Sequence, residues 1–75
     1  MDVVQLLGAN VRCYRKLKGM TQEQLAHEVG MERSYISDLE RGTRNPSVRA
    51  LGRLAEALSV PAEKLLEALP PQIET

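Results

Sequence analysis

Hydrophobic positions recur at three- and four-residue steps in five short segments of the chain, separated by glycine, proline or polar residues. The segments span residues 3–18, 21–30, 32–41, 47–58 and 61–69. This spacing places apolar side chains on one face of a helix. The pattern predicts an all-α fold of five short helices around one core, without strands or repeats.

The first segment has an apolar stripe at helical spacing that includes Val3, Leu7, Val11 and Tyr14. Gly19 is a natural end for this helix, because glycine tolerates the positive φ of a helix C-terminus. We therefore expect the first helix to run from residue 3 to residue 18.

Residues 21–42, TQEQLAHEVGMERSYISDLERG, predict two short helices joined by a tight turn. Thr21 followed by Gln24 is a capping-box start, in which each side chain bonds the backbone N–H of the other residue. Gly30 suits the turn between the helices, and Ile36 and Leu39 form the inward pair of the second helix. Many polar side chains of that second helix must then face outward.

The remainder of the chain predicts a polar loop at 43–46 and two further helices. Ser47 is a plausible N-cap for a helix to about residue 58, with Val48, Leu51, Leu54, Ala55 and Leu58 at helical steps. Pro61 can open the fifth helix, because its missing N–H costs little there. We expect a domain over residues 1–69 and a flexible tail at 70–75.

Size and composition indicate one small domain with an aliphatic core. The chain has 75 residues, and Tyr14 and Tyr35 are its aromatic residues. A lone cysteine, Cys13, cannot form an internal disulfide, and no long apolar run suggests export or a membrane span, so we expect a cytoplasmic protein. His27 lacks neighbours in metal-ligand spacing, so we predict no metal or cofactor, and no catalytic constellation.

Charge is distributed unevenly, although the net charge is zero. Residues 10–53 contain nine basic and five acidic residues, a balance of +4, whereas residues 54–75 have one basic and four acidic residues, a balance of −3. The basic part contains the two-helix unit. A molecule polarised in this way can dock a polyanion with one side.

The combined motifs of the two-helix unit resemble those of the lambda-repressor-like helix-turn-helix family, which includes the phage repressor and Cro DNA-binding domains. The residues that carry the resemblance are Thr21-Gln22, Leu25-Ala26, Gly30, Ile36-Ser37, Leu39-Glu40-Arg41-Gly42 and Asn45-Pro46-Ser47. The match covers about residues 7–69. It implies double-stranded DNA as the partner, with the helix at 32–41 in the major groove.

The resemblance also implies which residues meet DNA. Contacts to bases are expected from Arg33, Ser34, Asp38 and the flanking Ser37, with Arg33 suited to a bidentate pair with guanine. Contacts to the DNA backbone are expected from Gln22, Tyr35, Arg41, Thr43, Arg44, Asn45 and Arg12.

Some of these assignments have structural alternatives. Asp38 could instead orient Arg33 or Arg41, and Tyr35 could simply pack on the helix-turn-helix. By family analogy, Arg15 pairs with Glu40 and holds the first helix against the recognition helix. Cys13 is interpreted as a packing residue, with a redox role as the alternative.

Three positions depart from the usual pattern of the family. Glu32 stands where a Ser or Thr cap is common, Ser59 where a glycine often ends the fourth helix, and Pro61 where a polar cap often starts the fifth. The orientation of the last helix is therefore the least determined part of the predicted fold.

One domain of this size buries only roughly 600–1,000 Å² on DNA, so we expect a homodimer on an inverted-repeat operator. The fifth helix is the predicted seam, through Val60, Leu65, Leu66 and Leu69, although some of these leucines could close the monomer core. The function predicted is a small autoregulating transcription factor, such as a Cro-like repressor or a restriction-modification controller protein. An antitoxin that binds both DNA and a toxin is the alternative.

Overall fold

The computed structural model describes residues 2–68 and contains four α-helices and one 3₁₀ helix. In chain order these are α1 (Val3–Leu17), α2 (Gln22–Val29), α3 (Arg33–Glu40), α4 (Val48–Leu58) and η1 (Ala62–Leu66). None of the described residues forms a strand. The all-α prediction is confirmed, but the prediction of five α-helices is not, because the last element is a short 3₁₀ helix.

The starts of α1, α2 and α4 are fixed by side chains that bond otherwise unpaired backbone N–H groups. Thr21 Oγ1 accepts from Gln24 N at 3.0 Å, and Gln24 Oε1 accepts from Thr21 N at 2.7 Å. Ser47 Oγ accepts from Ala50 N at 3.1 Å. The two predicted caps are thus confirmed, and Asp2 provides a third, unpredicted one at the start of α1.

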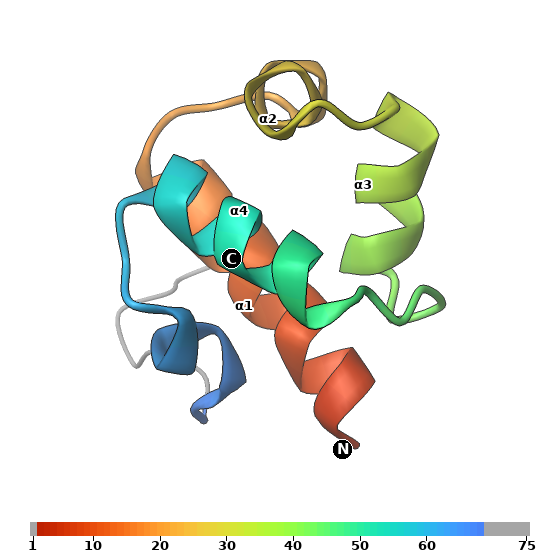
Figure 1. Cartoon of the computed structure of the whole chain (residues 1–75), viewed down its shortest axis with the longest axis vertical. Coiled ribbons are helices and arrows are strands. Elements are labelled where there is room, and N and C mark those ends of the chain that lie inside the picture. Colours follow the sequence, from red (N-terminus) through yellow and green to blue (C-terminus); the bar gives the residue numbers. More distant parts are fainter. Residues whose placement is uncertain (1, 69–75) are drawn as a thin grey trace.

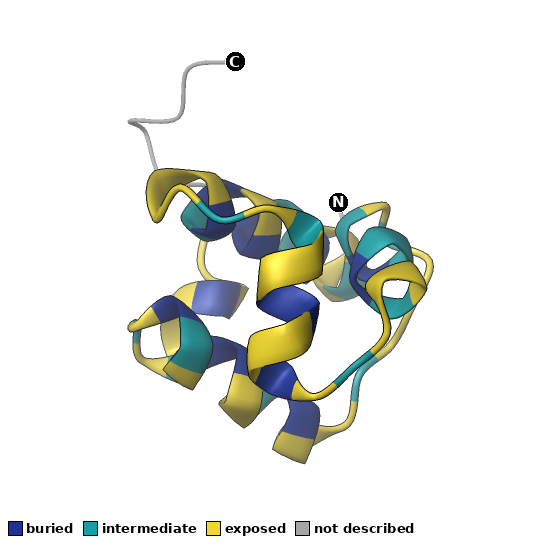
Figure 2. Cartoon of the chain, turned by 90° about the horizontal axis from the view of Figure 1, so that it is seen from above, coloured by how far each residue is buried: buried dark blue, intermediate teal, exposed yellow. Residues whose placement is uncertain are grey.

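The helices surround a small aliphatic core, as the composition predicts. α1 runs through the middle of the molecule, α2 and α3 lie at the top and right of the view, and η1 lies at the lower left (Figure 1). Figure 2 shows that buried positions of every element face inward. The largest fully buried hydrophobic side chains are those of Val11, Leu25, Ile36, Leu39, Leu54 and Leu65.

Some apolar residues of the predicted helical stripes lie outside this core. Val48 is 85% exposed and Val3 is 58% exposed, because each stands in the first turn of its helix, where the stripe extends beyond the neighbouring elements. The predicted stripes thus extend beyond the buried core at these two residues. These side chains leave apolar surface uncovered on one part of the molecule.

The segment predicted as a fifth α-helix over 61–69 is instead the five-residue η1. The buried side chain of Asn10 explains the difference. Its Nδ2 donates to the carbonyl oxygen of Leu65 at 3.0 Å and to that of Glu67 at 2.7 Å. These carbonyls are satisfied by a side chain of α1, so the segment needs no further helical turn.

The residues predicted to form the dimer interface are only partly exposed on the surface of one chain. Leu65 is fully buried in the monomer core, so its assignment to a dimer surface is wrong. Val60 is half-buried against the core, whereas Leu66 is 40% exposed. Leu69 lies outside the described residues. Leu65 therefore closes the core of a single chain.

α1 and the C-terminal end of α3 approach each other at Gly8. A Cβ atom at this position would lie 2.2 Å from the carbonyl oxygen of Leu39 and 3.2 Å from that of Glu40. Real Cβ atoms do not approach oxygen so closely, so this contact requires glycine. Gly8 thus sets the distance between α1 and α3.

Candidate nucleic-acid interface

The polar face predicted for the two-helix unit is present, and it is formed by the N-terminal ends of α2 and α3 and the loop after α3. Arg33 and Ser34 are exposed in the first turn of α3, and Gln22 is the half-buried first residue of α2. Ile36 and Leu39 anchor α3 from its other side, because both are fully buried. The core therefore determines which side chains of α3 face solvent.

A buried ion pair connects α1 to the end of α3, as the family resemblance implies. Arg15 Nε donates to Glu40 Oε2 at 2.6 Å, and Arg15 Nη2 donates to Glu40 Oε1 at 3.0 Å. Arg15 Nη1 also donates to the carbonyl oxygen of Met20 at 2.8 Å. The side chains are 10% and 3% exposed, so solvent screens this pair only weakly.

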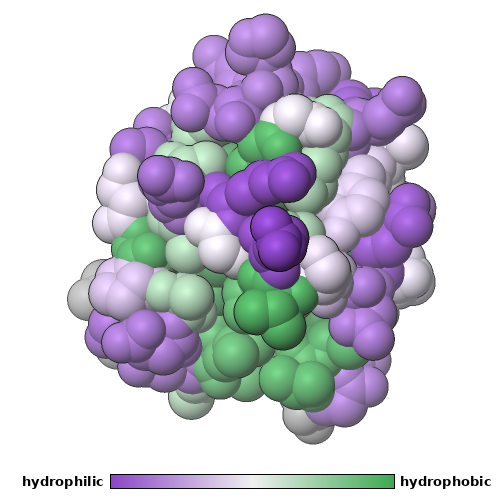
Figure 3. Space-filling view, in the orientation of Figure 1, coloured by the Kyte–Doolittle hydropathy of each residue, from purple (hydrophilic) through white to green (hydrophobic). Residues whose placement is uncertain are grey.

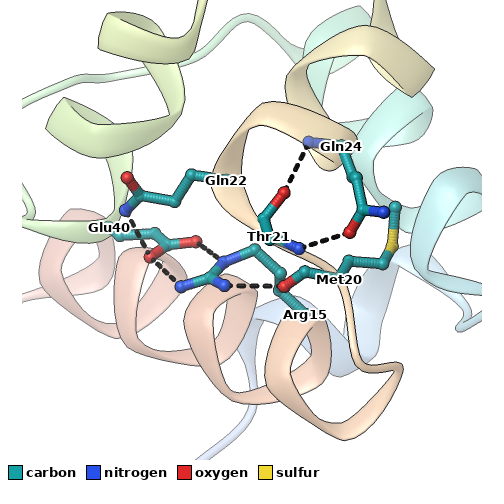
Figure 4. Close-up of polar contacts among 6 residues, drawn as sticks. All are labelled: Arg15, Met20, Thr21, Gln22, Gln24 and Glu40. Carbon is teal, nitrogen blue, oxygen red and sulfur yellow. Dashed lines mark hydrogen bonds and ion pairs between the residues drawn. The ribbon is translucent and has the colours of Figure 1, made fainter.

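Gln22 joins the same network. Its Nε2 donates to Glu40 Oε1 at 3.1 Å, and Figure 4 shows the amide of Gln22 lying beside the carboxylate that holds Arg15. One ionic contact thus fixes α1, the start of α2 and the end of α3 together. An amide nitrogen has two hydrogens, so Gln22 retains a second one for another acceptor.

The second turn of α3 is bonded internally. The Arg41 guanidinium pairs with the Asp38 carboxylate through Nη2 and donates from Nη1 to Ser37 Oγ at 2.9 Å. Asp38 also accepts two bonds at its carbonyl oxygen, from the N and Oγ1 of Thr43 at 3.0 and 3.1 Å. Of the two interpretations of Asp38, these contacts favour the orientation of Arg41.

The first turn of α3 is linked to α2 by an ion pair that sequence reasoning missed. Arg33 Nε lies 3.3 Å from Glu23 Oε2, and the two side chains are 59% and 68% exposed. The residues belong to different helices and have no helical spacing, so no local pattern predicts their contact. The pair spans the N-terminal ends of α2 and α3.

The loop after α3 rests on an aromatic side chain. The guanidinium carbon of Arg44 lies 4.5 Å from the centroid of the Tyr35 ring, within the range of a cation–π interaction. Tyr35 itself is half-buried against the core, while Thr43, Arg44 and Asn45 are exposed. The ring of Tyr35 therefore packs on the core and also supports Arg44. A contact of Tyr35 with the DNA backbone remains a prediction.

The remaining predicted contact residue, Arg12, is exposed on α1. It lies in sequence between Gly8 and Arg15, which both meet the end of α3.

Glu32 stands at the N-cap position of α3 and makes no side-chain capping bond. The departure from the family pattern at Glu32 therefore leaves the start of α3 without a side-chain cap.

Cys13 is a buried residue of α1. The residue is 5% exposed, and desolvation raises the pKa of its thiol, which disfavours the reactive thiolate. The buried position supports its interpretation as a packing residue. Among residues 2–68 there is no cluster of three or more His, Cys, Asp or Glu side chains placed to hold a metal ion.

None of the helices described between residues 2 and 68 is both long and apolar enough to cross a membrane.

The comparisons with known proteins agree with this geometry. A family model described as helix-turn-helix matches residues 11–65, which includes α2, α3 and α4. The chain belongs to this helix-turn-helix family. The resemblance seen in the sequence is confirmed.

Three relatives show what proteins of this family do elsewhere. The control protein C.SmaI of Serratia marcescens is 44% identical over 66 residues, covering 88% of this chain and 79% of that protein. The restriction-modification controller protein C.AhdI of Aeromonas hydrophila has a crystal structure with a TM-score of 0.80, 39% identity, and coverage of 83% of this chain and 94% of that chain. A third relative is SinR of Bacillus subtilis, the master regulator for biofilm formation, which was solved in complex with DNA. Its structure has a TM-score of 0.77 and 35% identity, and the match covers 81% of this chain and 98% of that chain.

Proposed function

We propose that this helix-turn-helix protein is a sequence-specific regulator of transcription that binds double-stranded DNA with α3 in the major groove. The observation that carries the proposal is the exposed first turn of α3, where Arg33 and Ser34 stand on a helix whose opposite side is anchored in the core. A likeness to SinR, solved in complex with DNA, supports it.

Arg33 is the residue proposed to read a base. Its guanidinium can donate two parallel hydrogen bonds to O6 and N7 of guanine, which discriminates by roughly 1–3 kcal/mol against a wrong base. Ser34, exposed in the same turn, is proposed to contact a base or a phosphate. Ser37 and Asp38 are proposed to act less directly, because both bond Arg41.

The side chains around α3 are proposed to hold the DNA backbone. Gln22 has an amide hydrogen left for a phosphate oxygen after its bond to Glu40. Other expected backbone contacts are Arg12, Tyr35, Arg41, Thr43, Arg44 and Asn45. Such contacts fix the position of α3 without reading sequence.

We further propose that two copies of the chain bind an inverted repeat, with recognition helices about 34–36 Å apart. Exposed apolar side chains gather where α1, α4 and η1 meet. Figure 3 shows this hydrophobic surface in the lower half of its view. Val3, Val48 and Leu66, which line one groove there, are the exposed side chains proposed to meet the second copy.

The proposed interface is tested by Val48→Glu, because Val48 is 85% exposed and its replacement does not disturb the core. Sedimentation of the variant should show a weaker dimer than the wild type. The control is Leu17→Glu, which places the same charge on an exposed leucine that does not line the groove. Equal dimerisation of wild type and Val48→Glu would place the interface elsewhere.

Selection of bound duplexes from a random DNA pool tests the proposed function as a whole. We expect enrichment of an inverted repeat, from which half-site and spacing are read together. Arg33→Ala should lose discrimination at one base pair in each half-site. Recovery of no sequence preference from the wild-type selection would overturn the proposal.

We propose autoregulation as the mode of action; the likeness to a control protein and to a restriction-modification controller supports a regulatory role. In that mode the protein binds an operator that overlaps its own promoter, and the concentration of dimer sets the output. Measuring transcription from the selected operator at increasing protein concentration tests this point.

A further inference from the structure

Arg33 makes its shortest contact with Glu23 through the inner nitrogen of its guanidinium. Its Nε lies 3.3 Å from Glu23 Oε2, and none of the hydrogen bonds among residues 2–68 involves its two terminal nitrogens. Arg41 differs, because both of its terminal nitrogens are engaged by Ser37 and Asp38. Arg15 is also bonded through all three of its nitrogens.

This arrangement matters because guanine is recognised by two parallel donors of a guanidinium. A carboxylate at Nε leaves both terminal nitrogens available while it limits the rotamers of a long side chain. An arginine ordered before binding loses less side-chain freedom when it meets its base. The contact is therefore better suited to positioning Arg33 for its base than to keeping Arg33 away from DNA.

We infer that Glu23 is a positioning residue that determines how strongly Arg33 discriminates guanine from other bases. This inference rests on the proposed function. Glu23 itself lies one residue after Gln22, whose amide is fixed to Glu40. The carboxylate that orients Arg33 therefore belongs to a helix start that the buried network already holds in place.

The size of the expected effect follows from the exposure of the pair. Solvent-exposed ion pairs are weak, so removing one should reduce a specificity ratio by about two- to five-fold rather than abolish it. Loss of Glu23 also removes a negative charge near DNA, which strengthens binding to all sequences. A ratio of the affinities for two duplexes cancels that general effect, so a change in the ratio reports only how Glu23 positions Arg33.

The experiment measures fluorescence anisotropy with two duplexes for each variant. One is the operator selected from the random pool, and the other has the base pair read by Arg33 replaced by an A·T pair. That pair is identified as the position where Arg33→Ala loses discrimination. The wild-type ratio should be roughly 5- to 150-fold, and Glu23→Gln should lower it about two- to five-fold.

Glu28→Gln is the matched control. Glu28 is an exposed residue of the same helix, so its replacement removes the same charge without touching Arg33. Its ratio should equal that of the wild type. In the Arg33→Ala background, Glu23→Gln should leave the ratio unchanged, because there is no side chain left to position.

A second measurement needs no DNA. Nitrogen-15 relaxation of the Arg33 Nε–Hε group should show an ordered side chain in the wild type and faster averaging in Glu23→Gln. Melting curves confirm that both glutamine variants are folded, as expected for exposed residues.

The outcomes separate the inference from the function it rests on. A normal wild-type ratio with no change in Glu23→Gln, or with an increase, overturns the inference alone; an increase would show that Glu23 sequesters Arg33. Equal Arg33 order in wild type and Glu23→Gln also overturns it. A wild-type ratio near one overturns the proposed function and the inference together.

Discussion

Arg15 and Glu40 form a two-bond ion pair that connects the first helix to the end of the recognition helix, with both side chains nearly excluded from solvent. Gln22 and the carbonyl of Met20 complete its hydrogen bonds. Because the network joins α1, α2 and α3, its loss would affect both stability and the geometry of the DNA face.

We expect Glu40→Ala to lower the free energy of unfolding by about 3–5 kcal/mol, because Arg15 would remain buried without its counter-ion. Urea denaturation followed by circular dichroism measures the change. Asp38→Ala is the control, since its ion pair with Arg41 is much more exposed than the Arg15–Glu40 pair and should contribute at most about 1 kcal/mol. Similar losses in the two variants would contradict the role of burial.

Two helical glycines should respond in opposite ways to alanine. Gly8→Ala places a methyl group against the backbone oxygen of Leu39, so α1 and α3 must separate, and we expect a loss of at least about 2 kcal/mol. Gly52→Ala meets nothing within 4 Å and should stabilise α4 by about 0.5–1 kcal/mol. Thermal melts of both variants test this pair. A tolerated Gly8→Ala would show that the α1–α3 spacing can adjust.

Local signals explain why most of the fold was predictable. The capping box of Thr21 and Gln24 and the N-cap Ser47 each depend on residues three apart in the chain, and both are present. The apolar periodicity likewise identified the fully buried Ile36 and Leu54. These features need no knowledge of tertiary structure.

Contacts between distant residues explain what was missed. Nothing in the local pattern shows that Asn10 caps the carbonyls of Leu65 and Glu67, so the last segment was predicted as an α-helix and Leu65 as surface. The ion pair of Glu23 with Arg33 likewise joins two helices. The Arg15–Glu40 pair was predicted because the family resemblance implies this contact between residues that are distant in the sequence.

Asn10 should be essential for the position of η1. Asn10→Asp keeps nearly the same volume but replaces the donor Nδ2 by an oxygen, which donates to neither carbonyl when ionised and to only one when protonated. We expect a loss of about 2–4 kcal/mol in the free energy of unfolding, measured by urea denaturation. Asn45→Asp, at an exposed loop position, is the control and should change stability by less than about 0.5 kcal/mol. A stable Asn10→Asp would mean that other groups hold η1.

The stacking of Arg44 on Tyr35 provides a test of how the loop after α3 meets DNA. Tyr35→Phe keeps a ring beneath the guanidinium and removes only the hydroxyl group. If the ring acts as a support, Tyr35→Phe should bind the selected operator within about two-fold of the wild type, because aromatic stacking survives. A larger loss with a reduced salt dependence would instead indicate a phosphate contact by the hydroxyl.

Arg44→Ala completes this test by removing the cation that the ring supports. The variant should bind every sequence more weakly and reduce the slope of log affinity against log salt by about one, as expected for one lost phosphate contact. The ratio between selected and random duplexes should stay nearly constant. A fall in that ratio would show that Arg44 contacts a base, and the supported arginine would then contribute to specificity as well as to affinity.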